Sequence, residues 1–174
     1  MTSKTSFKLP ISPQSQVRGW AGDRATLGGG PELPVFYPAT GQKISVVIED
    51  DEASVDIAVT TARQAFDKGP WPGLSNSERI TVLERCGQVI RDNADELARL
   101  ECAATGLILR ELKERHMVRA AHNFRFFADY ISQRSGERYD QTPGYMTTVV
   151  REPVGVAALI APWNAPVALA TMKI

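Results

Sequence analysis

The residues best suited to chemistry lie near the end of the chain, where an apolar run leads into a turn between two prolines. The run 154–160 is apolar on both faces, which predicts a parallel strand covered by helices. Ligands of open α/β sheets bind just beyond the carboxyl ends of such strands. Pro162 and Pro166 restrict the turn around Asn164, so its amide could donate a hydrogen bond to an oxyanion. An asparagine in such a turn is more often a helix cap, and on the residues alone both roles stay open.

The two cysteines are the candidate nucleophiles of the sequence. Cys86 and Cys102 both fall in amphipathic helical segments, and neither has a histidine at a productive spacing. A thiol becomes a strong nucleophile where a base or a positive environment lowers its pKa. We therefore expect both cysteines to pack as small apolar side chains. Two cysteines are also too few for a disulfide scaffold or a four-ligand zinc site.

Structural interpretations also fit other polar and glycine-rich positions better than chemical ones. His116 and His122 are six residues apart, which is not the i, i+4 spacing that directs two ligands at one metal ion, so no metal site is expected. The triplet 28–30 (Gly-Gly-Gly) follows no strand and opens no helix, which argues against a dinucleotide-binding loop. The charged positions between residues 78 and 115 lie opposite apolar stripes and are expected to be solvated.

Two short strands and a helix are predicted in the first part of the chain. Residues 1–34 contain glycine and proline too often for a long element. The strands 35–37 and 44–48 are joined by a tight turn. Asp51 is the expected N-cap of the helix, so the Asp50-Asp51 carboxylates are assigned to its start rather than to acid–base chemistry. The helix is expected to end at Gly69-Pro70. Its apolar face consists of Val55, Ala58, Val59, Ala62, Ala65 and Phe66.

Three more helices are predicted before Gly136. Ser75 and Glu78 form a capping box, and the stripe behind it consists of Val82, Leu83, Cys86, Val89 and Ile90. A helix from Asn93 to Gly106 carries the stripe Leu97, Leu100 and Ala104. One longer helix from residue 109 to about residue 133 is expected to bury Met117, Ala120, Ala121, Phe124, Phe127 and Ile131.

The texture changes after this helical part. Residues 145–150 are β-prone and partly alternating, which predicts an exposed antiparallel strand, and a helix begins at 167–170. The sequence then contains only one predicted core strand. The neighbours of a parallel strand normally come from further β-α-β crossover connections. The chain therefore has the pattern of the front part of an α/β domain.

Composition and charge narrow the class of protein. The 174 residues include 20 Lys+Arg and 20 Asp+Glu, so the formal charge is 0, and 43% of them are hydrophobic. A neutral balance argues against nucleic acid or an anionic membrane as the main partner. The sequence contains no run of about 18 apolar residues, which a membrane-spanning helix would need. Residues 1–8 also lack the apolar run of a secretory signal. A cytoplasmic globular protein is expected.

Several motifs together resemble those of one known family. The segments 151–156 (Arg-Glu-Pro-Val-Gly-Val) and 160–166 (Ile-Ala-Pro-Trp-Asn-Ala-Pro) closely resemble the aldehyde dehydrogenase superfamily. The segment 37–41 (Tyr-Pro-Ala-Thr-Gly) looks like that family's Asn-Pro-Ala-Thr-Gly turn. Further matches follow in family order, namely the helix to Phe66, Trp71, Ser77-Glu78-Arg79, Thr105-Gly106, Asn123 to Ala128 and Lys173. The resemblance covers roughly Val35 to the end of the chain.

The resemblance implies an α/β fold, of which this chain forms the N-terminal part: helices plus the first strand of a Rossmann-like parallel sheet. Family members oxidise aldehydes to acids with NAD or NADP, through a cysteine thiolate and a water activated by a glutamate. By resemblance, Asn164 is the oxyanion donor. The residues beside the nicotinamide and ribose are Ile160, Ala161, Pro162 and Trp163. Lys173 is assigned a structural role.

The resemblance also implies an organisation and partners. We expect an irregular lead-in over 1–34, the helical part of the cofactor-binding domain over 35–136, the start of an oligomerisation segment over 137–150, and the first core strand with the start of the next helix over 151–174. Strands such as those of 137–150 pair between subunits in the family's dimers and tetramers. A homodimer or homotetramer that binds an aldehyde is therefore expected for the parent enzyme.

The chain departs from the family pattern in ways that bear on activity. The family's phosphate-binding glycine loop, glutamate base and nucleophilic cysteine all lie beyond the position of Asn164, and neither Cys86 nor Cys102 occupies the nucleophile's place. Tyr37 replaces asparagine in the turn, and 107–108 (Leu-Ile) replaces the usual Lys-Pro. We therefore expect a truncated chain that is inactive alone.

Three points stay open at this level: the function of the chain, its substrate and its cofactor. The alternative function is that of a non-catalytic remnant, or interaction protein, that docks on full-length subunits. The segment 123–130 and Ala165 look similar to the branch that acts on semialdehydes from aromatic ring cleavage. The choice between NAD and NADP stays open as well, because the family's residues that distinguish the two cofactors at the ribose lie beyond the position of Ile174.

Overall fold

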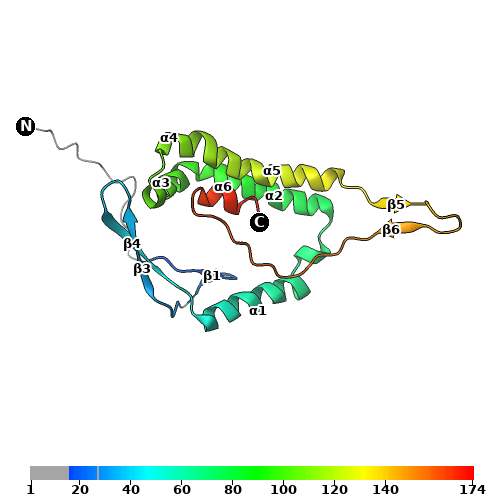
Figure 1. Cartoon of the computed structure of the whole chain (residues 1–174), viewed down its shortest axis with the longest axis horizontal. Helices are drawn as coiled ribbons and strands as arrows, with labels where there is room; N and C mark the ends of the chain where they lie inside the picture. Colours follow the sequence, from blue (N-terminus) through cyan, green and yellow to red (C-terminus); the bar gives the residue numbers. More distant parts are fainter. Residues whose placement is uncertain (1–15, 27) are drawn as a thin grey trace, which may run out of the picture.

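Helices form the larger part of the structure, and short antiparallel hairpins lie around them (Figure 1). The computed structural model describes residues 16–26 and 28–174. The helices are α1 (Glu52–Lys68), α2 (Asn76–Asp92), α3 (Ala94–Thr105), α4 (Leu109–Glu111), α5 (Met117–Gln133) and α6 (Pro166–Ala170). A 3-10 turn, η1 (Trp71–Gly73), precedes α2, and a π turn, η2 (Leu112–His116), joins α4 to α5. The strands pair two by two: β1 (Trp20–Ala21) with β2 (Arg24–Ala25), β3 (Glu32–Tyr37) with β4 (Gln42–Ile48), and β5 (Glu137–Tyr139) with β6 (Thr147–Val149).

The β3–β4 hairpin confirms the two predicted strands and the turn between them. The Tyr37 carbonyl accepts the N–H of Gly41 at 2.8 Å, and Gly41 has a φ of +70°, which glycine adopts without steric cost. Tyr37 and Ile44 are buried with Ala103 of α3. The hairpin is therefore attached to the helices through its own apolar side chains.

The described residues among 16–34, which were expected to be irregular, contain the β1–β2 hairpin, the first three residues of β3 and an isolated pairing at Val17. Val17 pairs in parallel with Val47, since its N–H donates to Val46 O at 2.8 Å and its carbonyl accepts the N–H of Ile48 at 2.9 Å. The amides of Gly29 and Gly30 both donate to the carbonyl of Glu49. The glycine triplet thus bonds to the chain's own backbone. The part of the predicted lead-in that covers residues 1–15 lies outside the described residues.

The predicted starts of α1 and α2 and the predicted end of α1 are confirmed. The Asp51 carboxylate accepts the N–H of Ser54 at 2.9 Å, and α1 ends at Gly69. At the start of α2 the Ser75 N–H donates to the Glu78 carboxylate at 2.8 Å, and the Glu78 N–H donates to the Ser75 hydroxyl at 3.3 Å. These contacts satisfy amides that have no acceptor within their own helix.

The main core lies in the helical layer, by which we mean α2, α3, η2 and α5. Leu112 and Met117 are fully buried with Ala98 and Cys102. One continuous helix was predicted from residue 109 to about 133, and the structure instead inserts the π turn, in which Met117 N–H donates to Leu112 O. Five residues of an α-helix rotate a side chain by about 140°. The wider turn brings Leu112 and Met117 into one cluster.

Several predicted apolar positions are less buried than expected. In α1 only Ser54 is buried, while Val55 and Val59 are exposed, and Val82 and Val89 are exposed in α2. The buried face of α3 consists of Ala98, Glu101, Cys102 and Ala103, so the predicted stripe is shifted. Exposed positions among those predicted to be buried also include Ala104 of α3 and Phe127 of α5.

The β5–β6 hairpin projects away from the helices, and the chain then returns in an extended path to α6 (Figure 1). The hairpin is exposed and antiparallel, as predicted. The predicted buried parallel strand over 154–160 is wrong for this structure, because the described residues 151–165 contain no strand and Val154 is fully exposed. A parallel strand needs neighbouring strands for its backbone groups, and none of the described strands lies beside it. No helix among the described residues has the length and apolarity needed to cross a membrane.

Candidate functional site

Asn164 lies at the end of the extended segment, directly before α6. The N-cap position of α6 is Ala165, so the interpretation of Asn164 as a helix cap is wrong. The Asn164 side chain is exposed and has no hydrogen-bond partner among the described residues. Its amide can therefore donate to another molecule. It lines a hollow of about 290 Å³ whose other lining residues are Arg115, His116, Arg119, Ala165, Ala168 and Leu169.

The basic side chains of this hollow come from the π turn and the first turn of α5. Arg115 is paired with Glu111, whose carboxylate lies 3.1 Å from the guanidinium. Among the described residues, the Arg119 guanidinium hydrogen-bonds only to the sulfur of Met172, at 3.6 Å, and makes no ion pair. Its positive charge is thus not compensated by a carboxylate. Neither arginine was predicted from the sequence, because spacing along α5 does not reveal that α6 packs beside them.

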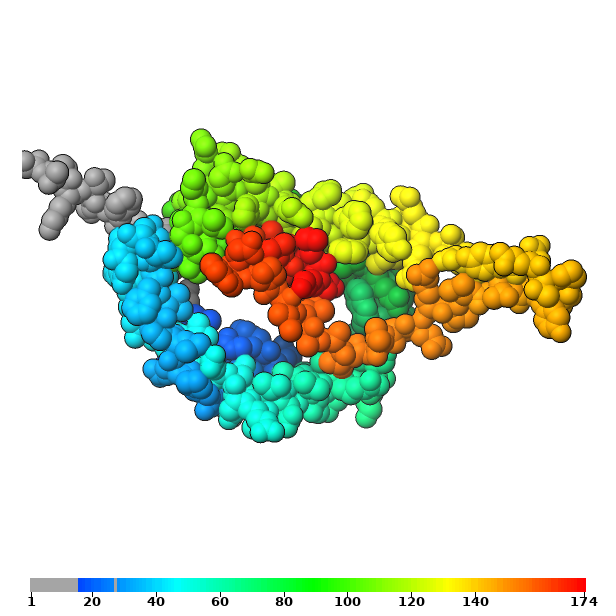
Figure 2. Space-filling view, viewed as in Figure 1, coloured from blue at the N-terminus to red at the C-terminus, as the bar shows by residue number. Residues whose placement is uncertain are grey.

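The predicted cofactor-side residues form an open surface. Ile160 and Trp163 are each 80% exposed, Pro162 is exposed and Ala161 is half-buried. The segment crosses the molecule with open space on both sides (Figure 2). Lys173 donates from Nζ to the carbonyl of Ile160, which agrees with the structural role expected of it.

These four residues fit one side of a cofactor site. An indole face and unpaired extended backbone suit the ring and ribose of a nicotinamide nucleotide. The described residues offer no glycine loop for its phosphates, since Gly29 and Gly30 bond to Glu49. The fit therefore concerns the nicotinamide end of the cofactor alone.

Neither cysteine joins this site. Cys102 is buried in the helical layer, and burial raises the pKa of its thiol, which disfavours the thiolate. Cys86 is half-buried in α2. Their predicted packing role agrees with these positions.

The histidines are also separated from each other in role. His116 Nδ1 lies 3.4 Å from Glu101 Oε1, whereas His122 is exposed. In the part of the chain that the structure describes, no group of three or more His, Cys, Asp or Glu side chains could hold a metal ion.

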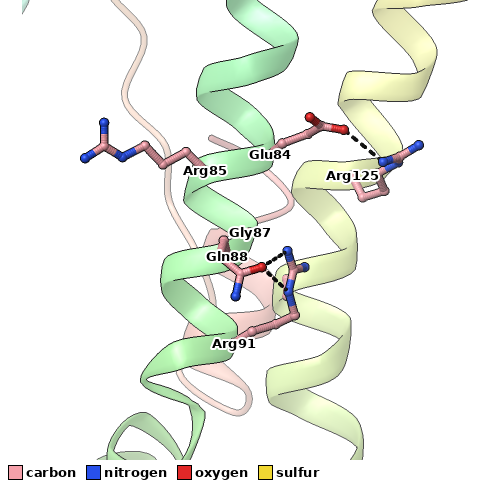
Figure 3. Close-up of a pocket in the computed structure, with 7 residues that line it drawn as sticks. Glu84, Arg85, Gly87, Gln88, Arg91 and Arg125 are labelled. Carbon is pink, nitrogen blue, oxygen red and sulfur yellow. Dashed lines mark hydrogen bonds and ion pairs between the residues drawn. The ribbon is translucent and has the colours of Figure 1, made fainter.

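A larger hollow of about 740 Å³ lies between α2 and α5, away from the predicted site (Figure 3). Within it the Arg125 guanidinium lies 2.8 Å from the Glu84 carboxylate, and Arg91 donates to the Gln88 amide oxygen at 2.8 Å. Figure 3 shows that the two side chains of each pair are bonded to one another, so the four side chains do not point at a common centre. None of the predicted site residues lines this hollow, so size alone does not identify the site.

Comparison with known proteins gives one consistent family. The family model "Aldehyde dehydrogenase family" matches residues 27–174. The chain is 39% identical over 159 residues to 5-carboxymethyl-2-hydroxymuconate semialdehyde dehydrogenase of Escherichia coli, covering 91% of this chain and 33% of that protein. It is 40% identical over 141 residues to 2-hydroxymuconic semialdehyde dehydrogenase of Pseudomonas sp. (strain CF600), covering 79% and 29%. The chain thus spans about a third of the length of these curated relatives.

Solved structures agree with the sequence matches. The aldehyde dehydrogenase KauB from Pseudomonas aeruginosa superposes with a TM-score of 0.83 at 28% identity, over 92% of this chain and 32% of that one. The NAD+ complex of an aldehyde dehydrogenase from Bacillus cereus gives a TM-score of 0.76 at 30% identity, over 82% and 29%. With the family model matching most of its length, the chain belongs to the aldehyde dehydrogenase family.

Proposed function

We propose that this protein contributes to the NAD(P)-dependent oxidation of an aldehyde to a carboxylic acid, with Asn164 as the oxyanion donor. The observation that carries the proposal is the free Asn164 amide in a hollow that also contains the uncompensated Arg119. A carbonyl oxygen gains negative charge when a nucleophile adds to the aldehyde carbon. A pre-positioned amide N–H stabilises that charge as it develops.

The complete reaction consumes an aldehyde, water and oxidised cofactor, and it gives a carboxylic acid, reduced cofactor and a proton. The cofactor, when bound, accepts the hydride from the substrate carbon. In our proposal Ile160, Pro162 and Trp163 line its nicotinamide side, and Ala161 belongs to the same strip. In our proposal neither Cys102, which is buried with a raised pKa, nor Cys86, which is half-buried in α2, supplies the thiolate nucleophile.

We further propose that the aldehyde carries a carboxylate, as a semialdehyde does. Both relatives described above are semialdehyde dehydrogenases by name. In this chain the guanidinium of Arg119 shares the hollow with Asn164, and among the described residues its only hydrogen bond is to the thioether of Met172. A planar guanidinium can bind a carboxylate through two parallel hydrogen bonds. A substrate with an aldehyde at one end and a carboxylate at the other would engage both residues.

The test of the oxyanion role is steady-state kinetics on the native gene product, purified after its intact mass has been measured. We expect aldehyde-dependent reduction of NAD or NADP, and we expect Asn164→Ala to lower kcat by about 100- to 1,000-fold. Asn76→Ala, at an exposed position of α2 without a side-chain bond, is the matched control. No aldehyde oxidation, or an unchanged kcat in Asn164→Ala, would overturn the proposal. The 174 residues expressed alone should give no reduction.

The substrate class is tested by comparing a muconic semialdehyde with a neutral aldehyde of similar length. Arg119→Met should lower kcat/KM for the carboxylate-bearing aldehyde by about 10- to 100-fold, because a charge-assisted hydrogen bond is lost. The neutral aldehyde should be affected little. Arg115→Met is the control, since Glu111 already neutralises Arg115. Equal losses for both aldehydes would contradict a carboxylate contact.

A second candidate function, docking on other aldehyde dehydrogenase subunits, is favoured by the open apolar segment 154–163 and by the projecting β5–β6 hairpin. We propose that residues 137–150 contribute to a dimer or tetramer, and that 35–136 and 151–174 belong to the cofactor-binding part. Size-exclusion chromatography with light scattering tests this. A monomer that recovers no full-length subunit would argue against it.

A further inference from the structure

Glu101 is a buried carboxylate that the proposed reaction does not use. It lies on the packed face of α3, only 4% exposed, between the buried residues Ala98 and Cys102. It contradicts the expectation that the charged positions between residues 78 and 115 are solvated. A charge in such a place is costly unless polar partners compensate it.

The partners of Glu101 lie on α6 and on the π turn. Its Oε2 accepts the backbone N–H of Val167 at 3.1 Å, and its Oε1 lies 3.4 Å from His116 Nδ1 without a hydrogen bond between the two atoms. The first N–H groups of a helix have no acceptor within that helix. Pro166 has no N–H and Ala165 has no polar side chain, so Val167 is the first donor of α6 that needs a partner. Glu101 caps α6 from 66 residues away.

Asn123 of α5 holds the other end of α6. Its Nδ2 donates to the carbonyl of Ala168 at 2.9 Å and to the hydroxyl oxygen of Thr171 at 3.0 Å. Carbonyls in the last turn of a helix likewise lack intrahelical partners. The short helix α6, which lies against the helical layer (Figure 1), is therefore fixed at both ends by side chains of α3 and α5.

We infer that Glu101 and Asn123 are positioning residues for Asn164. Residues 161–164 make no hydrogen bond with the described part of the chain, so the placement of this turn depends on the helix that follows it. Fixing α6 fixes the point from which the Asn164 amide is presented to the hollow. The catalytic meaning of this placement rests on the proposed function, whereas the attachment of α6 does not.

The test compares local and global stability of the full 174-residue chain. We expect Glu101→Met to make the amides of Leu169 and Thr171 exchange about five- to tenfold faster, as loss of a helix cap would. The midpoint of urea unfolding should change less than the local stability of α6, because removing the desolvation cost of a buried charge offsets part of the penalty for leaving the Val167 N–H unpaired. Glu96→Met, an exposed glutamate on the same helix, is the control and should change neither quantity.

A conservative variant and a direct probe of Asn164 complete the test. Glu101→Gln keeps an acceptor oxygen at the same reach, so exchange in α6 should return to within about twofold of the wild type. The backbone NMR order parameter of Asn164 should fall in Glu101→Met and in Asn123→Leu, while that of Asn76 stays unchanged. Unchanged exchange in α6, or equal losses of local and global stability, would overturn the inference. Neither readout involves substrate or cofactor, so this result is independent of whether the aldehyde oxidation itself is confirmed.

Discussion

Two regions of the molecule carry apolar side chains in their sequence but differ in burial. One is the helical layer, and the other is the open part, by which we mean α1 and residues 151–163. Leu112 and Met117 of the helical layer are fully buried, whereas Val55 and Val59 of α1 are exposed. The sequence pattern thus defines which side chains can be buried. Whether they are buried depends on the presence of an element that packs against them.

The two open segments also differ from each other, and the reason is where their backbone hydrogen bonds go. The helix α1 satisfies its own backbone, so it forms without a packed apolar face. Residues 154–160 would need neighbouring strands for the same purpose, and they remain extended without pairing. A helix can form before its tertiary partner is present, and a parallel strand cannot.

The largest expected difference in stability between the two regions comes from truncating one leucine in each of them. Leu112→Ala, at a fully buried position, should lower the free energy of unfolding by about 2–5 kcal/mol, because it removes apolar contacts and leaves a cavity. Leu159→Ala, at a half-exposed position, should change it by less than about 0.5 kcal/mol. Urea denaturation of both variants measures the difference. Similar losses would mean that residues 151–163 are packed in solution.

A smaller effect is expected where α2 and α5 approach each other. A Cβ added at Gly87 would lie 3.0 Å from the carbonyl oxygen of Ala121. Overpacking typically costs about 1–3 kcal/mol, and replacing a helical glycine by alanine returns about 1 kcal/mol, so Gly87→Ala should lose about 1 kcal/mol in net terms. Gly136→Ala, where a Cβ meets nothing within 4 Å, is the control in the same thermal melts. A stabilised Gly87→Ala would show that the two helices can separate freely.

The smallest effect is a difference in acid sensitivity between α1 and α2. The Ser54 N–H lowers the pKa of Asp51, and the Ser75 hydroxyl, followed by the Ser75 N–H, lowers the pKa of Glu78. Because folding lowers both pKa values, these carboxylates stabilise the folded state above their ordinary pKa, and this contribution is lost as the pH falls through the folded values. On acidification, amide protection in α1 should therefore fall by a larger factor than in α2, which is also held by packing against α5. Equal losses of protection in both helices would contradict the comparison.

Local chemistry made much of the fold predictable. The Asp51 cap, the Ser75–Glu78 capping box and the turn that ends at Gly41 each depend on residues within a few positions of one another. Their geometry is therefore encoded in short stretches of sequence. The π turn at 112–116 was missed because it arises from fitting Leu112 and Met117 into one core.

The candidate site was predictable only in part. The proline-bracketed turn marked Asn164 and its neighbours, since proline restricts the backbone wherever it occurs. The helical spacing of Ala98 and Cys102 was a signal that Glu101 lies on a packed face. An apolar pattern does not, however, indicate which polar group would bind a charged residue on that face. Arg119 and Asn123 could not be assigned either, because their contacts with Met172 and with α6 join positions 45 or more residues apart.

By itself, the sequence determined the family, most of the helix boundaries and the position of the candidate oxyanion donor, because motifs, caps and turns act over a few residues. Only the tertiary structure decided that residues 154–160 stay unpaired, that Glu101 caps α6, and that Arg119 shares a hollow with Asn164. Those outcomes depend on which elements meet in space. Hydrogen bonds and burial between distant segments are satisfied by packing, and a linear pattern does not contain that geometry.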